Sequence, residues 1–301
     1  MSRILVTGID GFTGRYLAPM LAAQGHEVHG LVQCAPEPSH PLPPGVQALH
    51  ACDLLDAQGL ERVAKDVRPE KVAHLAGIAF IGHGDVGGIY RTNLIGVRYL
   101  LAALAAGDTP PESVLLVSSA NIYGNTNAGV IDESVPPAPV NDYGVSKLAM
   151  EYMAAIWNAR LPITVVRTFN YTGIGQSEDF LLPKIVSHFR RRAAVLELGN
   201  LDVERDFSDV RTVADCYRRL LDANAVGQVL NVCSGVGHTL RGVLQMASEI
   251  TGHVPEIRVN PAFVRANEVQ KLVGSRAALE RAIGPVSGPS LRDTLRWMLA
   301  S

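Results

Sequence analysis

The chain has 301 residues, of which 47% are hydrophobic and 19% are charged, and its formal net charge is -2. This length suits one large or two small globular domains. So weak a charge does not favour binding to nucleic acid or to an anionic membrane, and we expect neither as a partner. The first apolar run is too short for a signal peptide, and no stretch could span a bilayer. The four cysteines share no metal-ligand spacing, so we expect free thiols, no metal and a reducing, cytoplasmic location.

Strands and helices are predicted to alternate along most of the chain. Runs of apolar, β-branched residues predict strands at 3–7, 27–32, 49–54, 71–75, 114–118, 163–167 and 228–232. Amphipathic patterns predict helices at 15–24, 86–106, 143–160, 181–192, 213–223 and 240–251. This alternation predicts an α/β fold of the Rossmann type, a doubly wound parallel sheet with helices on both faces.

The last third of the sequence lacks this regular alternation. We therefore expect a smaller C-terminal α/β domain that binds substrate. The Rossmann domain is placed at 1–170, with 206–233 returning to it, and the second domain at 171–205 and 234–301.

A glycine pattern lies between the first predicted strand and the first predicted helix. Gly8 would permit a tight turn, Gly11 would let the backbone approach a pyrophosphate, and Gly14 would allow close helix–strand packing. The helix N-terminus adds N–H donors for phosphate groups. The segment predicts a dinucleotide site, and the alternative is a glycine-rich turn that binds no nucleotide.

Tyr143 and Lys147 are four residues apart on a predicted helix, so both lie on one face. Hydride transfer at a carbinol carbon needs a proton partner, and a tyrosine with a free pKa near 10 can serve. Lowering that pKa to about 7 takes roughly 4 kcal/mol, which a nearby Lys147 ammonium and a nicotinium charge could supply. Tyrosine and lysine also recur at this spacing on ordinary surface helices, which is the alternative.

The glycine pattern, with Thr7 before it and Phe12 inside it, resembles that of the extended short-chain dehydrogenase/reductases, as do Tyr143 and Lys147. The resemblance runs from about Arg3 to Trp297 and implies that Ser119, rather than Ser118, completes a catalytic triad. The cofactor-binding residues that it implies are Gly8, Gly11, Phe12, Thr13, Gly14, Gln33, Asp53, Leu54, Leu75, Ala76, Gly77, Asn93, Tyr143 and Lys147.

The cofactor choice depends on the end of the second predicted strand. NAD-selective sites carry a carboxylate there for the ribose hydroxyls, whereas this chain has Gln33. No fixed charge at this position would repel a 2′-phosphate, and Arg15 could lie nearby. We therefore expect NAD(P), with NADPH weakly preferred.

The segment from 118 to 124 also limits the chemistry. Sugar 4,6-dehydratases carry an acidic residue here, where this chain has Ala120 and Asn121. Without that carboxylate, elimination of water is disfavoured. Reduction, or oxidation and reduction at one carbon, remains open.

The segment 167–176 resembles one of nucleotide-sugar enzymes, and 198–210 resembles one of enzymes that bind GDP-linked 6-deoxyhexoses. The segment 265–269 resembles one that holds the nucleotide, although Ala266 replaces the usual Pro. The substrate-binding residues so implied are Asn121, Asn170, Leu182, Lys184, Asn200, Arg205, Arg265 and Glu268. For Arg205 and Arg265 the alternative is a structural salt bridge.

The overall pattern is most similar to that of the GDP-4-keto-6-deoxy-D-mannose reductases, which make GDP-D-rhamnose. It implies reduction of the 4-keto group of a GDP-4-keto-6-deoxyhexose. A nucleotide-sugar 4-epimerase with tightly bound NAD would use the same triad, and a cofactor-sensing regulator with an inactive site is a third possibility. In many relatives the helices that correspond to 86–106 and 143–160 form a dimer interface, which predicts a homodimer.

Overall fold

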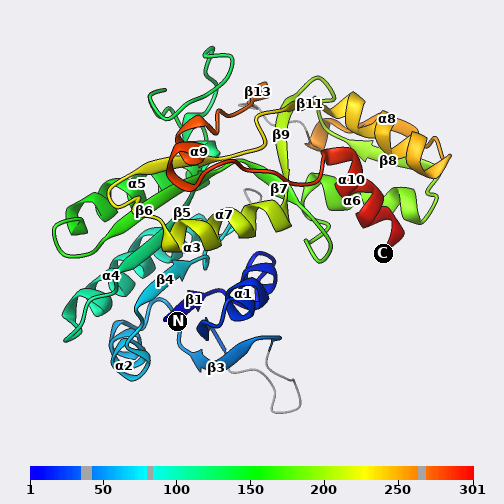
Figure 1. Ribbon diagram of the computed structural model, residues 1–301. Helices are drawn as coiled ribbons and strands as arrows, with labels where there is room; N and C mark the ends of the chain where they lie inside the picture. Colours follow the sequence, from blue (N-terminus) through cyan, green and yellow to red (C-terminus); the bar gives the residue numbers. More distant parts are fainter. Residues whose placement is uncertain (35–42, 80–83, 264–268) are drawn as a thin grey trace.

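A central sheet of seven parallel strands organises the molecule (Figure 1). The computed structural model describes residues 1–34, 43–79, 84–263 and 269–301. The strands are β1 (Arg3–Thr7), β2 (Glu27–Val32), β3 (Val46–Ala51), β4 (Lys71–His74), β5 (Ser113–Ser119), β6 (Ile163–Thr168) and β10 (Val229–Val232). Their order is β10-β6-β5-β4-β1-β2-β3. This is the Rossmann arrangement, so the predicted fold class is confirmed.

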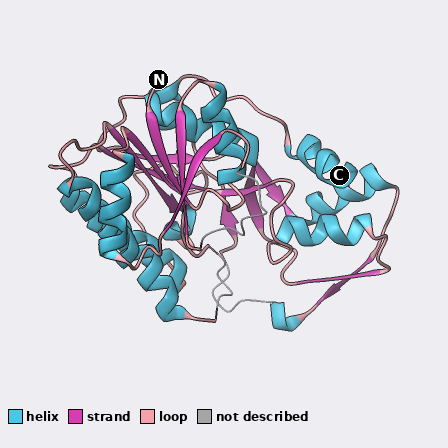
Figure 2. Ribbon diagram, turned by 90° about the horizontal axis from the view of Figure 1, so that it is seen from below, coloured by secondary structure: helices cyan, strands magenta, loops and turns pink. Residues whose placement is uncertain are grey.

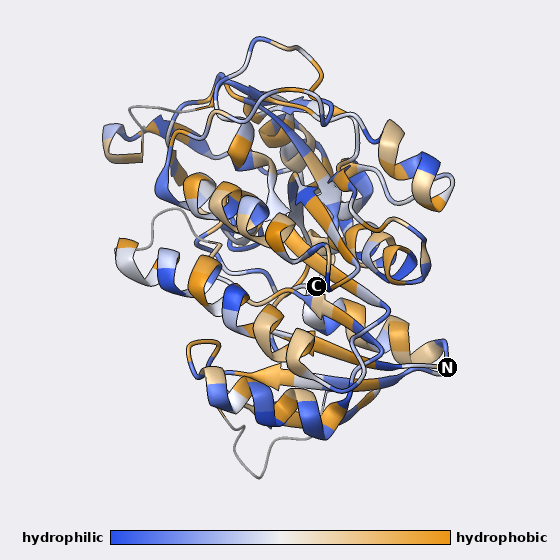
Figure 3. Cartoon of the chain, turned by 90° about the vertical axis from the view of Figure 1, so that its left-hand side faces the viewer, coloured by the Kyte–Doolittle hydropathy of each residue, from blue (hydrophilic) through white to orange (hydrophobic). Residues whose placement is uncertain are grey.

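Helices cover both faces of this sheet, and each face has its own hydrophobic core (Figure 2). One core includes α1 (Gly14–Ala23), α7 (Val210–Asp222) and α9 (Ala277–Ile283). The other includes α2 (Ala57–Val67), α4 (Val97–Ala106) and α5 (Asp142–Trp157). In Figure 3 the central strands are mostly hydrophobic along their length, as expected when both faces of a parallel sheet are covered.

A second group of elements lies beside the central sheet. Strands β7 (Asn170–Thr172), β9 (Glu204–Asp209), β11 (Gly237–Thr239) and β13 (Lys271–Leu272) form a small mixed sheet, and β8 (Val195–Leu198) pairs with β12 (Glu256–Val259). Helices α6 (Leu181–Arg190), α8 (Leu240–Thr251) and α10 (Leu291–Ala300) share a third core and lie together near the C-terminus in Figure 1. The domain boundaries given above stay a prediction.

The carboxylate of Asp206 joins three segments of this second group. Its Oδ1 accepts hydrogen bonds from the backbone and the hydroxyl of Ser234, at 2.8 and 2.6 Å. Its Oδ2 accepts from the backbone N–H groups of Gly235 and Gly274, at 2.8 and 3.4 Å. Because Asp206 has no exposed surface, these donors replace the water that the carboxylate loses on folding. The contacts fix β9 against the turn after β10 and the segment after β13.

The structure corrects several predicted boundaries. The helix predicted at 86–106 is divided into α3 (Val86–Tyr90), a π-helical turn (Arg91–Gly96) and α4. The strand predicted at 49–54 is β3 at Val46–Ala51, so Asp53 follows the strand and is not part of it. Helix α2 was missed, although Leu60, Val63 and Val67 have helical spacing and are buried.

No helix of the described residues is long and apolar enough to cross a membrane. All four cysteines are free, as expected from their spacing.

Replacing Asp206 by Asn should destabilise the protein. The amide N–H₂ of Asn would face backbone donors, so at least one buried donor would lose its partner, at a cost of roughly 2–4 kcal/mol. Chemical unfolding measures this loss. The matched control is Asp202→Asn, because Asp202 forms an exposed ion pair with Arg241 and its loss should cost less than about 1 kcal/mol. Equal effects of the two substitutions would contradict this assignment.

Candidate active site

The glycine turn lies where β1 ends and α1 begins, at the carboxyl edge of the sheet. Gly8 has φ +65°, and a Cβ there would lie 2.9 Å from the Cα of Ala76. A Cβ on Gly14 would lie 2.4 Å from the carbonyl oxygen of Ile9. Both positions therefore require glycine, one for its backbone conformation and one for close packing. Such a turn at the strand-order reversal between β1 and β4 fits a dinucleotide diphosphate.

An aromatic contact holds the glycine turn against β7. The rings of Phe12 and Tyr171 are nearly parallel, with centroids 5.8 Å apart. The hydroxyls of Thr13 and Tyr171 are hydrogen-bonded at 2.8 Å. Burial raises the pKa of Tyr171, so its phenol stays neutral. This role of Tyr171 was not predicted, because nothing in the local pattern indicates a contact with residues so far away in the chain.

Gln33 and Asp53 meet beyond the ends of β2 and β3. The Gln33 amide donates to the Asp53 carboxylate at 3.1 Å, and the same carboxylate accepts from the backbone of Leu55. A fixed negative charge therefore lies beside Gln33. The expectation that no charge opposes a 2′-phosphate here was wrong, because the sequence did not show how close Asp53 lies. The neighbouring Leu54 is buried against Gly96.

The segment after β4 contributes Leu75, Ala76 and Gly77 to the same edge. Asn93, in the π-helical turn, is fully buried and bonds both backbone groups of Ile78, at 2.9 and 3.0 Å. A Cβ on Gly77 would lie 3.0 Å from Asn93 Oδ1 and 3.5 Å from Lys147 Nζ. These three residues are therefore adjacent, and π-helical turns are frequent at functional sites.

His74, at the end of β4, is buried beside this segment. Its Nδ1 is hydrogen-bonded to the Thr7 hydroxyl at 2.8 Å, whereas its Nε2 has no partner among the described residues. Burial, together with the positive charge of Lys147, lowers the pKa of His74 to about 3. The imidazole is therefore neutral at physiological pH.

The three predicted catalytic residues come together at the end of β5. Ser119 ends this strand and is hydrogen-bonded to the Tyr143 phenol of α5. Lys147 lies one turn further along α5, and its ammonium donates to the carbonyl of Val117 at 2.9 Å. All three residues are at least nine-tenths buried. A site so assembled can polarise a carbonyl and transfer a proton, which a purely cofactor-sensing protein does not need.

The pKa values of the site differ from the expected ones. Burial raises the pKa of Tyr143 to about 12, and the bond with Ser119 only partly offsets this. The predicted lowering by Lys147 is not seen, because desolvation of the phenol dominates among the protein groups. Burial lowers the pKa of Lys147 to about 8, against the opposing effect of Glu151.

Asn121 directs the Ser119 hydroxyl. Its backbone N–H and its side-chain amide both donate to Ser119 Oγ, each at 3.1 Å. This predicted substrate residue therefore lies within the catalytic group.

The other predicted substrate residues lie around the small sheet and α6. Asn170 donates to the carbonyl of Asp206 at 3.4 Å, and Asn200 accepts from the backbone of Asp202. Arg205 donates to the carbonyls of Glu204 and Gln270, at 3.0 and 3.2 Å. These contacts leave the proposed ligand roles untested.

Leu182 and Lys184 differ in what they can offer a ligand. Leu182 is buried in the third core. The Lys184 ammonium lies 4.0 Å from the centre of the Phe263 ring, beside a hollow of about 400 Å³. Arg265 and Glu268 lie outside the described residues.

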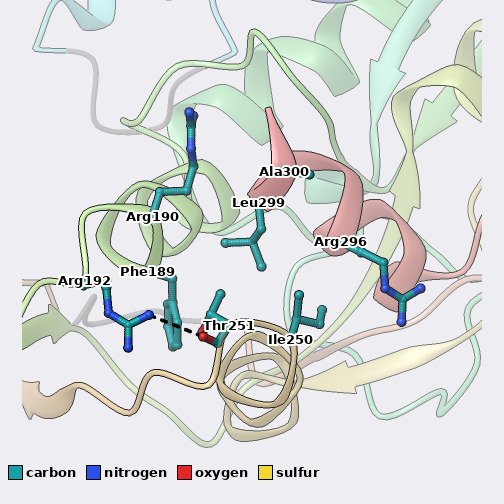
Figure 4. Close-up of a pocket in the computed structure, with 8 residues that line it drawn as sticks. All are labelled: Phe189, Arg190, Arg192, Ile250, Thr251, Arg296, Leu299 and Ala300. Atoms are coloured by element: carbon teal, nitrogen blue, oxygen red, sulfur yellow. Dashed lines mark hydrogen bonds between the residues drawn. The ribbon is translucent and has the colours of Figure 1, made fainter.

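A second hollow, of about 360 Å³, lies between the ends of α6, α8 and α10 (Figure 4). Its apolar wall includes Phe189 and Leu299, and the Arg192 guanidinium turns toward the carbonyl of Thr251. No triad residue lines it, so the chemistry is assigned to the sheet edge.

Residues 4–233 match the NAD dependent epimerase/dehydratase family. The match covers more than half of the chain, and the chain belongs to this family.

Two curated relatives are similar over nearly the whole chain. The GDP-6-deoxy-D-talose 4-dehydrogenase of Aggregatibacter actinomycetemcomitans is 32% identical over 94% of this chain and 91% of its own length. The GDP-6-deoxy-D-mannose reductase of Pseudomonas aeruginosa is 33% identical over 99% of this chain and 96% of its own length.

Two solved structures share the fold over their full length. One is an epimerase candidate from Burkholderia cenocepacia J2315, 51% identical with a TM-score of 0.92, covering 99% of this chain and 97% of the other. The second is the RMD protein of Pseudomonas aeruginosa in complex with NADPH, 31% identical with a TM-score of 0.84, covering 100% and 98%.

The buried His74 predicts how stability depends on pH. Its folded-state pKa of about 3 lies below the unfolded value, so its contribution is complete above about pH 6.5 and is lost as the pH falls. Between pH 7 and 4.5 the free energy of unfolding should fall by roughly 2–3 kcal/mol through this group alone. His74→Gln should remove that part of the slope, as measured by urea unfolding. His26→Gln, at a more exposed histidine, should leave most of it; an unchanged slope in His74→Gln would contradict the assignment.

Proposed function

We propose that this protein is an NAD(P)H-dependent reductase of the 4-keto group of a GDP-4-keto-6-deoxyhexose. The observation that carries the proposal is the buried group of Ser119, Tyr143 and Lys147 with Asn121 in place of a dehydratase acid. The names of both curated relatives support a GDP-linked 6-deoxyhexose, and the name of the talose 4-dehydrogenase supports C4 as the reacting carbon. The NADPH bound to the RMD protein supports the cofactor.

In this mechanism the Ser119 hydroxyl donates a hydrogen bond to the substrate carbonyl and polarises it. The bound nicotinamide supplies the hydride. As negative charge develops on the carbonyl oxygen, Tyr143 Oη transfers its proton there. A pKa of about 12 keeps Tyr143 protonated at neutral pH, which suits a proton donor in the direction of reduction. Lys147 holds a positive charge beside Gly77 and Asn93, where the ribose is expected.

The nucleotide diphosphate is assigned to the second group of elements. Arg205 would reach the phosphates, with Asn170 and Asn200 nearby, and Lys184 would line the nucleotide end. Leu182 would contribute through its backbone. Arg265 and Glu268 keep their sequence-based assignment to phosphate and to the nucleoside.

We retain a weak preference for NADPH. Arg15 is exposed beside the glycine turn and donates through Nε to the carbonyl of Asp10, so its charge lies near the cofactor edge. The carboxylate of Asp53 opposes it from the other side. These opposed charges favour use of both cofactors with only a modest difference in affinity.

A homodimer would cover an apolar stripe on the surface. Val145, Tyr152 and Ile156 are 39%, 68% and 79% exposed and share one face of α5. Ile95 of the adjoining π-helical turn is also exposed. So many large apolar side chains together are typical of a protein interface.

Purified protein should convert GDP-4-keto-6-deoxy-mannose with oxidation of NADPH and, less efficiently, of NADH. The product is identified by nuclear magnetic resonance, which distinguishes the rhamnose from the talose configuration at C4. Either product supports a C4 reductase, whereas no turnover with either nicotinamide would refute the proposal.

Tyr143→Phe should reduce kcat by roughly 10²–10⁴, because the proton donor is lost. Cofactor affinity should change little, since the ring remains. Tyr152→Phe on the same helix, at an exposed position, is the matched control and should retain full turnover. Undiminished turnover in Tyr143→Phe would disprove this mechanism.

A nucleotide-sugar 4-epimerase is the second candidate, favoured by the epimerase candidate that is 51% identical. Such an enzyme retains NAD through purification and returns the hydride to the substrate. Absorbance of the denatured protein's supernatant shows whether NAD was retained. Stoichiometric NAD, with interconversion of C4 epimers and no net oxidation of added NADPH, would favour the epimerase.

Sedimentation analysis tests the dimer. Wild type should sediment as a dimer, and Tyr152→Glu with Ile156→Glu should sediment as a monomer, because charges would be buried in the interface. Val254→Glu, at an exposed valine outside α5, is the control and should remain dimeric. A monomeric wild type would rule out this interface.

A further inference from the structure

Helix α5 contacts the end of β5 through three side chains spaced four residues apart. Tyr143 is bonded to Ser119, and Lys147 donates to the carbonyl of Val117. The third, Glu151, accepts a hydrogen bond from the Ser118 hydroxyl at 2.5 Å. The spacing places all three on one helix face, so Glu151 extends the row formed by the two catalytic residues.

Glu151 is fixed on its other side by Arg167 of β6. The guanidinium donates through Nε and Nη2 to both carboxylate oxygens, with a closest distance of 2.8 Å. It also donates to the Tyr123 phenol at 3.0 Å, which in turn donates to Asn231. These side chains are all at least nine-tenths buried. A charged network of this kind is costly to bury and is a weak source of stability.

The network also acts on the charge of Lys147. Among the residues that the structure describes, the titratable groups next to Lys147 are Tyr143 and Glu151 on its own helix and His74 on β4. Burial keeps Tyr143 and His74 uncharged at neutral pH, since their pKa values are about 12 and about 3. Of the described groups, Glu151 is thus the anion beside Lys147, and its charge partly offsets the burial that lowers the pKa of Lys147 to about 8.

We propose that Glu151 is a positioning residue of the active site, which keeps Lys147 positively charged and holds Ser118, and with it the adjacent Ser119, in place. This role concerns cofactor binding and the geometry of the triad. It rests on the nicotinamide cofactor of the proposed function but not on the identity of the sugar nucleotide, so failure of the sugar assay leaves it intact.

The test is the dissociation constant of NADPH, measured by fluorescence between pH 6.5 and 9.5. In wild type, affinity should fall as the pH rises through about 8, because Lys147 then loses its proton. In Glu151→Gln the midpoint should move down by about one pH unit, which weakens binding roughly fivefold at pH 8 and less than twofold at pH 6.5. A loss that is uniform over this range, with an unchanged midpoint, would overturn the proposal.

Ser118→Ala is the matched control. It removes the hydrogen bond to Glu151 but leaves the carboxylate and its charge. Its midpoint should stay at the wild-type pH, although turnover should fall if Ser119 shifts. A midpoint that moves as far as in Glu151→Gln would overturn the electrostatic assignment.

Glu151→Gln leaves Arg167 buried without its anion and could unfold the protein. The double variant Glu151→Gln with Arg167→Gln removes both buried charges, so it keeps the test available if the single variant unfolds, and its midpoint should again lie below that of the wild type. Lys147→Arg gives an independent reading, because a guanidinium stays charged throughout this range. Its affinity for NADPH should not fall near pH 8, and a fall that persists would overturn the proposal.

Discussion

The docking of α5 on the end of β5 determines the geometry of the whole site. Three consecutive residues of the strand each contact a different side chain of the helix. A shift of one residue along the strand, about 3.3 Å, would break all three contacts together. Because the side chains are buried, each lost contact would leave a polar group without a partner. The register between strand and helix is therefore strongly fixed, and with it the distance between Ser119 and Tyr143.

The parallel sheet brings the remaining groups to this point. Its strands end at one edge, so the turn after β1, His74 at the end of β4 and Ser119 at the end of β5 become neighbours. The small sheet is fixed against this edge by contacts of its own. Tyr171 binds the glycine turn, and Asp206 holds the segments around β9. Through these contacts, the residues that would bind the cofactor lie close to the residues that would bind the nucleotide sugar.

Local signals predicted much of this arrangement. The glycine spacing and the Tyr143–Lys147 pair depend on neighbours in the sequence, and the Rossmann sheet depends on the alternation of elements. The contacts of Tyr171 and Arg167 join distant segments, so no local pattern indicates them. The direction of the Tyr143 pKa shift follows from burial, which a sequence does not show. The position of Glu151 next to Lys147 could have been predicted, because Glu151 lies four residues after Lys147 on the same helix face.

Asn121, in place of the acidic residue of the dehydratases, determines how the Ser119 hydroxyl can be used. Ser119 Oγ accepts two hydrogen bonds from Asn121, which occupy both of its lone pairs. Its own hydrogen is then free to be donated only, toward Tyr143 or a substrate oxygen. A carboxylate at this position would instead accept that hydrogen and turn the hydroxyl away. Asn121, which stands where the dehydratases carry their acid, therefore also orients Ser119 as a hydrogen-bond donor. Ketone reduction requires such a donor to the substrate carbonyl.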